Sequence, residues 1–286
     1  MKDIRLGISP CPNDTFIFYH LLKRQRLHFD IEPIIKDVEV LNRMVLAGHL
    51  DVSKVSFALA GRVLDRYIIL ESGAALGRGC GPLILSKRPI PYHELSDSVI
   101  AIPGKNTTAT LLLQLYAPEA VHLVEMPFDK IVQAICRGDV DAGCVIHETR
   151  FTYKDFGLVK VQDLGKWWEE TTGMPIPLGG IIAKRKLMSK QLKLMQEAIK
   201  KSITFAKENF HEVSLFVKDH AQEISSEVQK KHIDLYVNEY SYQMGTEGRG
   251  AVRMLFQRAM AAGLMETKVE GPIFLEELLS ETEERT

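Results

Sequence analysis

Short apolar runs alternate with amphipathic stretches through most of the chain. The runs Ile4–Ile8 and Ile31–Ile35 predict strands, and Val38–Ala47 carries apolar residues at helical spacing. From Ser189 onward the apolar positions follow helical spacing almost throughout, and we expect the acidic tail Glu276–Glu284 to fray. The pattern predicts an α/β fold with a helical C-terminal region. Further strands are predicted at Asp51–Phe57, Tyr67–Leu70, Pro82–Ser86, Ser98–Ile102, Val121–Met126, Ala142–Ile146, Leu158–Val161 and Leu178–Ala183.

The length of the chain favours two lobes. With 286 residues it exceeds the usual single domain and can bury a core in each of two units. The segment Lys87–Pro91 has the composition of a connection, and the strand at Leu178–Ala183 is expected to run back to the first lobe. We therefore predict that residues 1–88 and 184–286 form the first lobe and residues 89–183 the second.

Composition narrows the class of protein. Hydrophobic residues make up 45% of the chain and charged residues 26%, and a formal charge of -1 gives no field that would hold nucleic acid or an acidic membrane. The N-terminus lacks the apolar stretch of a secretory signal, and no run is long enough to span a bilayer. We expect a cytoplasmic protein with a small-molecule partner and with reduced cysteines, since the 4 cysteines have no CxxC spacing. The pattern indicates no oligomeric state.

The strand Ala142–Ile146 ends abruptly in polar residues. His147 and Glu148 follow it directly, and Arg150 comes soon after. In a parallel α/β sheet the carboxyl ends of the strands border the ligand crevice, so the first polar side chain there is a candidate for chemistry. Imidazole titrates near neutral pH and can take up and return a proton. His147 is therefore a candidate base; the alternative is a structural histidine that caps the following turn.

The loop after the first strand carries two further candidates. Ser9 and Asn13 stand in a loop that two prolines restrict, just before a helix. They would lie at the edge of a ligand cleft. The alternative is a capped turn in which Asn13 or Asp14 accepts the free amides of the helix and does nothing more.

Two other strand ends offer contacts for an anion. Lys54 and Ser56 place a cation and a hydroxyl at the start of a short helix, although Lys54 could instead be a solvated surface lysine. Thr107 and Thr108 precede the helix predicted at Ala109–Leu115, where hydroxyls and unpaired amides attract a carboxylate or a phosphate. For Thr107 the alternative is a simple N-cap.

Three familiar motifs are approached but not matched. Gly77, Gly79 and Gly81 lack the GxGxxG spacing, and a mobile loop that enters a strand accounts better for them. The Gly-Lys pair before Asn106 fails the P-loop pattern, which requires Ser or Thr at that position. The pattern HExxH requires a second histidine where Phe151 stands, so a metal there is not expected.

Several runs together resemble a known family. They include SPCPNDTFIF from Ser9, IHETRFTY from Ile146, the triplet Lys54, Val55, Ser56, and Pro103-Gly104 with Thr107-Thr108. Over nearly its whole length the chain is similar to the 1,4-dihydroxy-6-naphthoate synthases of the futalosine route to menaquinone.

The resemblance implies both a fold and an activity. The fold is that of type II periplasmic binding proteins, with two α/β lobes, a cleft between them and the helical C-terminal region packed on the first lobe. The activity is a lyase reaction that converts cyclic dehypoxanthinyl futalosine, a carboxylated substrate, to 1,4-dihydroxy-6-naphthoate without metal or organic cofactor. His147 corresponds to the proposed base of the family. The positions Lys54 to Ser56 and Thr107-Thr108 correspond to its substrate contacts.

Three alternatives share this fold. A solute-binding protein would normally be exported and has no need of a base at a strand end. A ligand-sensing regulator would need a DNA-binding helix-turn-helix, whereas this chain opens directly with a strand of the cleft. A chorismate dehydratase, an enzyme of the same pathway, is disfavoured by the SPCPNDTFIF and IHETRFTY runs.

Overall fold

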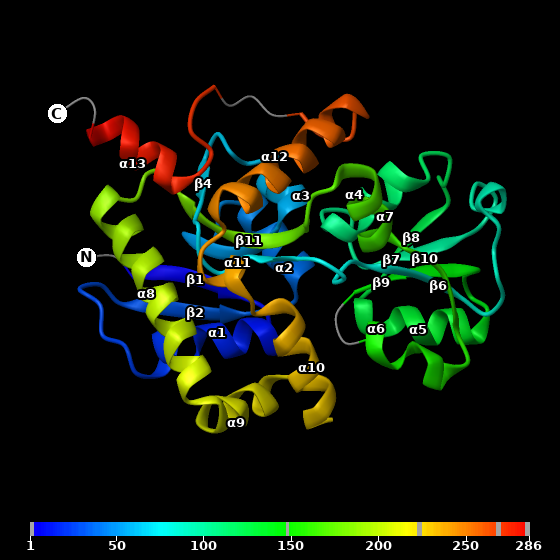
Figure 1. Cartoon of the computed structure of the whole chain (residues 1–286), viewed down its shortest axis with the longest axis horizontal. Helices are drawn as coiled ribbons and strands as arrows, with labels where there is room; N and C mark the ends of the chain where they lie inside the picture. Colours follow the sequence, from blue (N-terminus) through cyan, green and yellow to red (C-terminus); the bar gives the residue numbers. More distant parts are fainter. Residues whose placement is uncertain (1–2, 147–148, 222–224, 267–269, 284–286) are drawn as a thin grey trace.

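A computed structural model describes residues 3–146, 149–221, 225–266 and 270–283 of the chain. Figure 1 shows two sheets side by side along the long axis of the molecule, each flanked by helices. Within the described residues the first sheet has six strands, in the order β2-β1-β3-β11-β4 with β5 paired to β11. These strands are β1 Ile4–Ile8, β2 Ile31–Ile35, β3 Val52–Ser56, β4 Tyr67–Ile69, β5 Ala75–Gly77 and β11 Ile176–Lys184.

The second sheet has the order β10-β6-β9-β7-β8. The strands β7, β8 and β9 run parallel, and β6 and β10 are antiparallel to their neighbours. Because β1, β2 and β3 are also mutually parallel, each sheet has one edge at which carboxyl ends of parallel strands meet. The strands of this sheet are β6 Leu83–Ser86, β7 Ile100–Ile102, β8 Leu123–Glu125, β9 Ala142–Val145 and β10 Val159–Asp163.

The chain changes sheet earlier than the composition of Lys87–Pro91 predicted. Strand β6 already pairs with β9 and β10, so the first crossing precedes Leu83. The return strand β11 lies in the first sheet from Ile176 onward, where it pairs with β3, β4 and β5. The predicted limits at residues 88 and 183 thus differ from the sheet membership. The exposed, proline-containing turn after β6 has the composition of a linker but stays within the second lobe.

Close backbone packing marks the first crossing. A Cβ atom on Gly81 would lie 2.2 Å from Cα of Gly165, and a Cβ atom on Gly165 would lie 2.6 Å from the amide nitrogen of Gly81. Neither position can take a side chain without moving backbone. The glycines at this crossing therefore serve close approach, and Gly77 belongs to β5 where a mobile loop was expected.

Helices cover both sheets and connect their strands. The helices are α1 Pro12–Lys23, α2 Val38–Leu46, α3 Phe57–Ala60, α4 Thr108–Tyr116, α5 Phe128–Arg137, α6 Thr149–Thr152, α7 Leu164–Thr172, α8 Ser189–Glu208, α9 Phe210–His220, α10 Ser226–Tyr236, α11 Glu239–Tyr242, α12 Gly245–Ala261 and α13 Leu275–Glu283, with 3-10 turns η1 Tyr92–Glu94 and η2 Tyr153–Phe156. No described helix has the length and apolarity needed to cross a membrane.

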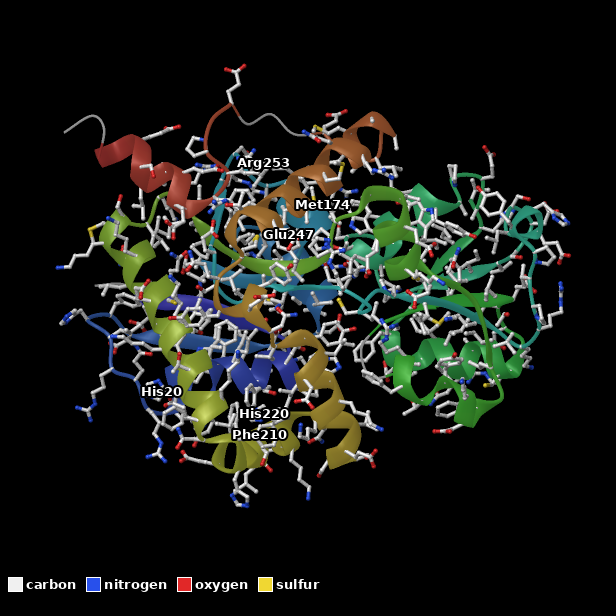
Figure 2. All side chains as sticks on the ribbon, in the orientation of Figure 1. His20, Met174, Phe210, His220, Glu247 and Arg253 are labelled. Atoms are coloured by element: carbon white, nitrogen blue, oxygen red, sulfur yellow. The ribbon has the colours of Figure 1, made fainter. Side chains whose placement is uncertain are left out.

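The C-terminal helices pack on the first lobe, as predicted. Helices α8, α9 and α10 all contact α1. Figure 2 labels His20, Phe210 and His220 in this region. Aromatic contacts join its helices, because the rings of Phe16 and Phe210 lie 5.5 Å apart and those of His20 and Phe205 lie 4.5 Å apart. This layer gives the first lobe a hydrophobic core of its own.

Helices α7 and α13 are held to the molecule by buried side chains. In helix α7, Trp168 is fully buried and donates from Nε1 to the carbonyl of Pro175 at 3.1 Å. The acidic tail continues as helix α13 to Glu283, because Leu275 is buried and Leu278 and Leu279 pack beside it on the first lobe's core. Spacing of three and four residues places these leucines on one face of the helix.

Candidate active site

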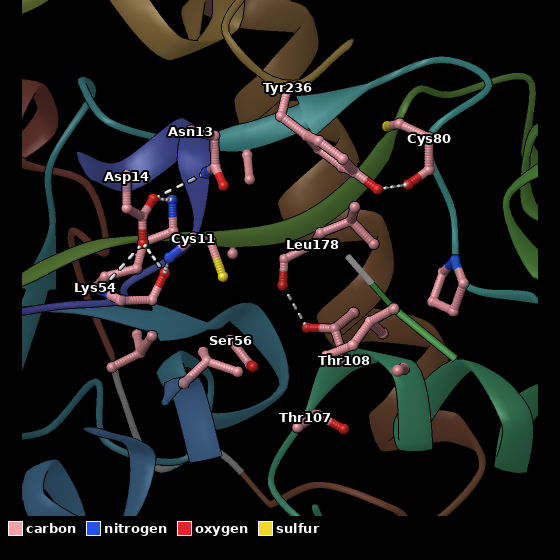
Figure 3. Close-up of a pocket in the computed structure, with 18 of the residues that line it drawn as sticks. Cys11, Asn13, Asp14, Lys54, Ser56, Cys80, Thr107, Thr108, Leu178 and Tyr236 are labelled. Carbon is pink, nitrogen blue, oxygen red and sulfur yellow. Dashed lines mark hydrogen bonds and ion pairs between the residues drawn. The ribbon is translucent and has the colours of Figure 1, made fainter. Parts of the chain in front are cut away.

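A cleft lies between the two sheets, where carboxyl ends of their parallel strands face each other. It holds about 660 Å³ of empty space including its mouth. Figure 3 shows walls contributed by both lobes. Seven predicted site residues belong to its lining: Ser9, Asn13, Lys54, Val55, Ser56, Thr107 and Thr108. The lining consists of Ser9, Cys11, Asn13, Asp14, Val38, Lys54, Val55, Ser56, Ala75, Cys80, Pro82, Thr107, Thr108, Ala109, Ile146, Leu178, Gly179, His232 and Tyr236.

Lys54 forms the charged centre of the first-lobe wall. Only 5% of the residue is exposed, so the alternative of a solvated surface lysine is wrong. Its Nζ lies 2.9 Å from Oδ1 of Asp14 and donates to the carbonyl of Gly73 at 3.0 Å. An ammonium group has three donors, and these two contacts use two of them. A buried cation of this kind needs its carboxylate partner, because an unpaired buried charge is costly.

Ser9 and Asn13 hold the carboxylate that pairs with Lys54. The Ser9 hydroxyl donates to Oδ2 of Asp14 at 2.6 Å, and Nδ2 of Asn13 donates to Oδ1 of Asp14 at 2.9 Å. The prediction that Asn13 or Asp14 caps helix α1 is wrong: the N-cap position is Cys11, which makes no capping bond with its side chain. Pro12 stands at the first position of the helix, where no amide hydrogen has to be satisfied.

Ser56 is tied to a polar cluster at the rim of the cleft. Its hydroxyl accepts from Nδ2 of Asn42 at 3.3 Å, and its amide donates to Oδ1 of Asn42 at 3.1 Å. Glu39, which is 5% exposed, accepts from the amide of Asn106 at 3.2 Å and from its Nδ2 at 2.7 Å. Because Glu39 lies on α2 and Asn106 lies before α4, this cluster joins the two lobes. Arg43 extends it by pairing with Glu39 and with Glu125 of β8.

Thr107 and Thr108 begin helix α4 on the opposite wall. Thr107 is the N-cap, as the simpler interpretation proposed: its Oγ1 accepts from the amide of Thr110 at 3.2 Å and donates to the carbonyl of Gly104 at 2.8 Å. The hydroxyl of Thr108 donates to the carbonyl of Leu178 at 2.6 Å and accepts from the amide of Ala58 at 3.2 Å. Both hydroxyl protons are therefore engaged with backbone. Within the described part of the chain, the amides of Thr108 and Ala109 have no hydrogen-bond partner, so they remain for a ligand.

His147 and Glu148 lie outside the described residues. Ile146, which precedes them, belongs to the lining of the cleft. On the other side of the gap, Arg150 of α6 donates from one terminal nitrogen to the carbonyl of Gly81 at 2.6 Å, and the other lies 3.5 Å from Oδ2 of Asp163. Arg150 thus ties the segment after β9 to the first crossing between the lobes.

Helix α10 contributes two polar lining residues, His232 and Tyr236, which the sequence pattern did not predict as site residues. Nε2 of His232 lies 2.9 Å from Oδ1 of Asn13, and the hydroxyl of Tyr236 donates to the carbonyl of Cys80 at 3.0 Å. A signal was present, since Gln229, His232 and Tyr236 follow helical spacing and place polar atoms on a buried face.

Burial keeps two of the four cysteines, Cys80 and Cys144, protonated. Burial raises the pKa of the Cys80 thiol to about 12 and that of the Cys144 thiol to about 12, so both stay protonated near neutral pH. All four cysteines are free thiols, as expected. Cys11, for which a ligand-facing position was left open, is buried and lies in the lining of the cleft.

The arrangement can hold a small ligand between donors on both walls. Lys54, whose charge is paired with Asp14, offers its third N–H donor from one wall, and the start of α4 offers free amides from the other, where the helix dipole also favours an anion. Apolar side chains of Val38, Val55 and Ile146 supply surface for a hydrocarbon ring between them. Among the described residues, no group of three or more His, Cys, Asp or Glu side chains is placed to hold a metal ion.

Solved structures define the fold. The chain matches the alkanesulfonate-binding protein of Xanthomonas axonopodis pv. citri with a TM-score of 0.69 at 12% identity, over 93% of this chain and 95% of that one. At this identity the likeness concerns the fold alone. It confirms the predicted two-lobed fold of the type II periplasmic binding proteins. A structural-genomics target from Archaeoglobus fulgidus matches with a TM-score of 0.88 at 37% identity, over 92% of this chain and 98% of that one.

Sequence comparison identifies the family. Residues 4–261 match the family described as menaquinone biosynthesis, and the chain belongs to it. It is 47% identical over 265 residues to the 1,4-dihydroxy-6-naphthoate synthase of Thermus thermophilus, covering 92% of this chain and 96% of that one. It is 42% identical over 268 residues to the synthase of the same name from Streptomyces coelicolor, covering 92% and 94% respectively. The family resemblance found in the sequence is thus confirmed.

Proposed function

We propose that the protein is a carbon-carbon lyase that converts cyclic dehypoxanthinyl futalosine to 1,4-dihydroxy-6-naphthoate in the cytoplasm. The main support for this proposal is that residues from the SPCPNDTFIF run and from the end of the strand that leads into IHETRFTY line the same cleft. These runs lie more than a hundred positions apart in the sequence. Their convergence on one cleft, in a chain related to synthases of this name, supports the activity.

The chemistry of the reaction matches the groups available. Breaking a carbon-carbon bond next to a carbonyl requires a base that takes up a proton and donors that stabilise the developing oxyanion. His147 is the proposed base, and Lys54 and the amides of Thr108 and Ala109 are the proposed donors and anion contacts. Loss of the sugar-derived carbons leaves an aromatic product, and aromatisation supplies the driving force.

The test is turnover by the wild-type protein and by His147→Asn. Each is incubated with the cyclic futalosine derivative and, separately, with chorismate, and the products are followed by absorbance and mass. We expect naphthoate from the wild type with the first substrate only. His147→Asn should lose at least about 10²-fold in single-turnover rate, because removing a general base costs this much, while its affinity for product stays within roughly tenfold.

Other outcomes would favour the alternatives. Binding without turnover of either compound would indicate a solute-binding protein, and consumption of chorismate would indicate the dehydratase. Retention of more than about a tenth of the wild-type rate by folded His147→Asn would exclude an essential base.

A further inference from the structure

His232 connects the C-terminal helices to the charged wall of the cleft. It is 1% exposed on α10, lines the cleft and packs its ring against that of Tyr236 at a centroid distance of 4.5 Å. Its Nε2 lies 2.9 Å from Oδ1 of Asn13. This distance is that of a hydrogen bond, but the ring nitrogen could in principle be either donor or acceptor. The neighbours of Asn13 decide between the two roles.

The role of Nε2 follows from the contacts of Asp14. The Asp14 carboxylate pairs with Lys54 and can only accept hydrogen bonds. Its Oδ1 is 2.9 Å from Nδ2 of Asn13, and the amide group presents its nitrogen there because only the nitrogen can donate. The oxygen of the Asn13 amide is then the atom that faces His232. Since this oxygen has no hydrogen to give, Nε2 of His232 must carry the proton and donate it.

We propose that His232 is a positioning residue of the reaction, protonated on Nε2, which fixes Asn13 and through it the Asp14 carboxylate that holds Lys54 and Ser9. The inference rests on the proposed function of this cleft. The relay runs from α10 through Asn13 to Asp14, where the Lys54 ammonium and the Ser9 hydroxyl meet the same carboxylate. It sets the direction of the remaining Lys54 donor, while the Ser9 oxygen also accepts from the amide of Cys11 at 3.4 Å.

The first test reads the proton directly. Protein labelled with ¹⁵N in its 9 histidines is examined without ligand by long-range nitrogen–proton correlation, and the His232 ring is assigned by its absence in His232→Gln. We expect a protonated Nε2, and we expect that Asn13→Ala, which removes the acceptor, changes this signal. An unprotonated Nε2 in the wild type, or a signal unaffected by Asn13→Ala, would overturn the relay.

The second test compares His232→Leu with His232→Gln. Glutamine can place a donor near the former Nε2, whereas leucine cannot. Because outer residues that orient a reactive group are worth about 10- to 100-fold, kcat should fall by about this factor in His232→Leu and recover to within about fivefold of wild type in His232→Gln. His220→Leu is the matched control, since His220 lies on α9 on the outer side of the first lobe and contacts Phe216 there (Figure 2). Its kcat should equal that of the wild type.

Each outcome bears on one proposal. Equal loss of kcat in the leucine and glutamine variants, or none in either, would contradict the positioning role, even where melting temperatures fall. If His232→Leu does not fold, the nitrogen spectrum and the glutamine variant still decide the relay. A wild-type protein without turnover on the futalosine derivative would overturn the proposed function, whereas the spectrum of the ligand-free protein would remain a test of the relay.

Discussion

The two walls of the cleft organise their polar groups differently. On the first-lobe wall, Lys54, Asp14, Ser9 and Asn13 satisfy one another through contacts that stay within the lobe. On the second-lobe wall, the hydroxyl of Thr108 bonds to Leu178 and Ala58, which belong to the first lobe. The polar groups of the first-lobe wall find their partners within their own lobe. On the second-lobe wall, the Thr108 hydroxyl has its partners only when the two lobes are in contact.

This difference separates two functions that a cleft enzyme needs. A preorganised charged wall fixes its donors before a ligand arrives, which limits the cost of ordering them on binding. A wall that depends on contacts across the cleft links the geometry of the site to closure of the lobes. The rim cluster of Glu39, Asn42, Arg43 and Asn106 reinforces this link, because Asn42 bonds to Ser56 of its own lobe and to the carbonyl of Asn106 across the rim.

Removing the Lys54–Asp14 ion pair of the first-lobe wall should reduce stability more than the other substitutions described below. Lys54→Met leaves the carboxylate of Asp14 without its cation, and the side chain of Asp14 is only 1% exposed. We expect a loss of about 3–5 kcal/mol in the free energy of unfolding, measured with urea, because removing one partner of a buried pair leaves an uncompensated charge. Product affinity should fall as well.

The matched control is the double variant Lys54→Met, Asp14→Asn, which removes both charges. It should recover much of the lost stability but not the affinity for product. A double variant as unstable as Lys54→Met alone would show that the ion pair is not the source of the loss.

Breaking the contacts across the rim should have a smaller effect, confined to closure. Glu39→Gln keeps the shape but removes the charge that both donors of Asn106 contact. Since hydrogen bonds to a charged group contribute about 1.5–3 kcal/mol, we expect KM to rise about tenfold or more with little change in kcat. Small-angle scattering should show a larger radius of gyration for the ligand-free variant than for the ligand-free wild type.

Glu94→Gln serves as the control, because Glu94 pairs with Arg88 at the surface within the second lobe and, among the described residues, makes no contact across the rim. It should change neither KM nor the radius of gyration. Scattering also tests closure in the wild type, which a bound product analogue should compact. No change in any of these radii would mean that the lobes are already closed without ligand and stay closed without Glu39.

Removing the cap hydroxyl of the second wall should have the smallest effect on stability and a selective effect on binding. We expect Thr107→Val to cost about 1 kcal/mol through loss of the cap and to weaken binding of the carboxylated product more than that of its carboxamide, because α4 no longer holds its first amides in place. Thr107→Ser keeps the cap and should bind like the wild type. Equal losses for both ligands would place the carboxylate elsewhere.

The pattern of apolar and polar residues predicted the bounds of the strands well. It predicted less well which residues from distant parts of the chain lie next to one another. Strands β1 and β2 have the predicted bounds because polar or proline-rich segments delimit their apolar runs. The ends of β1 and β3 share one edge of the first sheet, whereas the segment before α4 follows β7 of the second sheet and was assigned to the same cleft by the family resemblance. His232 was missed because helical spacing shows that a face is buried but not what it is buried against.

Pairing between distant segments explains the remaining differences. Whether Lys54 is buried depends on Asp14, and nothing in the residues around Lys54 indicates that partner. Likewise, the linker-like turn at Lys87–Pro91 differs from a true crossing only in which sheet the preceding strand joins. The composition of a segment indicates whether the segment is exposed. It does not indicate the strand with which the segment pairs.

The position of β11 in the first sheet constrains how the protein is made. This strand sits between β3 and β4 and also pairs with β5, yet its residues follow the whole second lobe in the chain. During synthesis, one edge of β3 stays unpaired in the sheet of β1, β2 and β3 until the residues of β11, which end at Lys184, have left the ribosome. The inserted lobe has all of its strands before then. The second lobe can therefore be completed before the first, and the growing chain exposes an edge of β3 that is open to pairing with other chains until β11 is made.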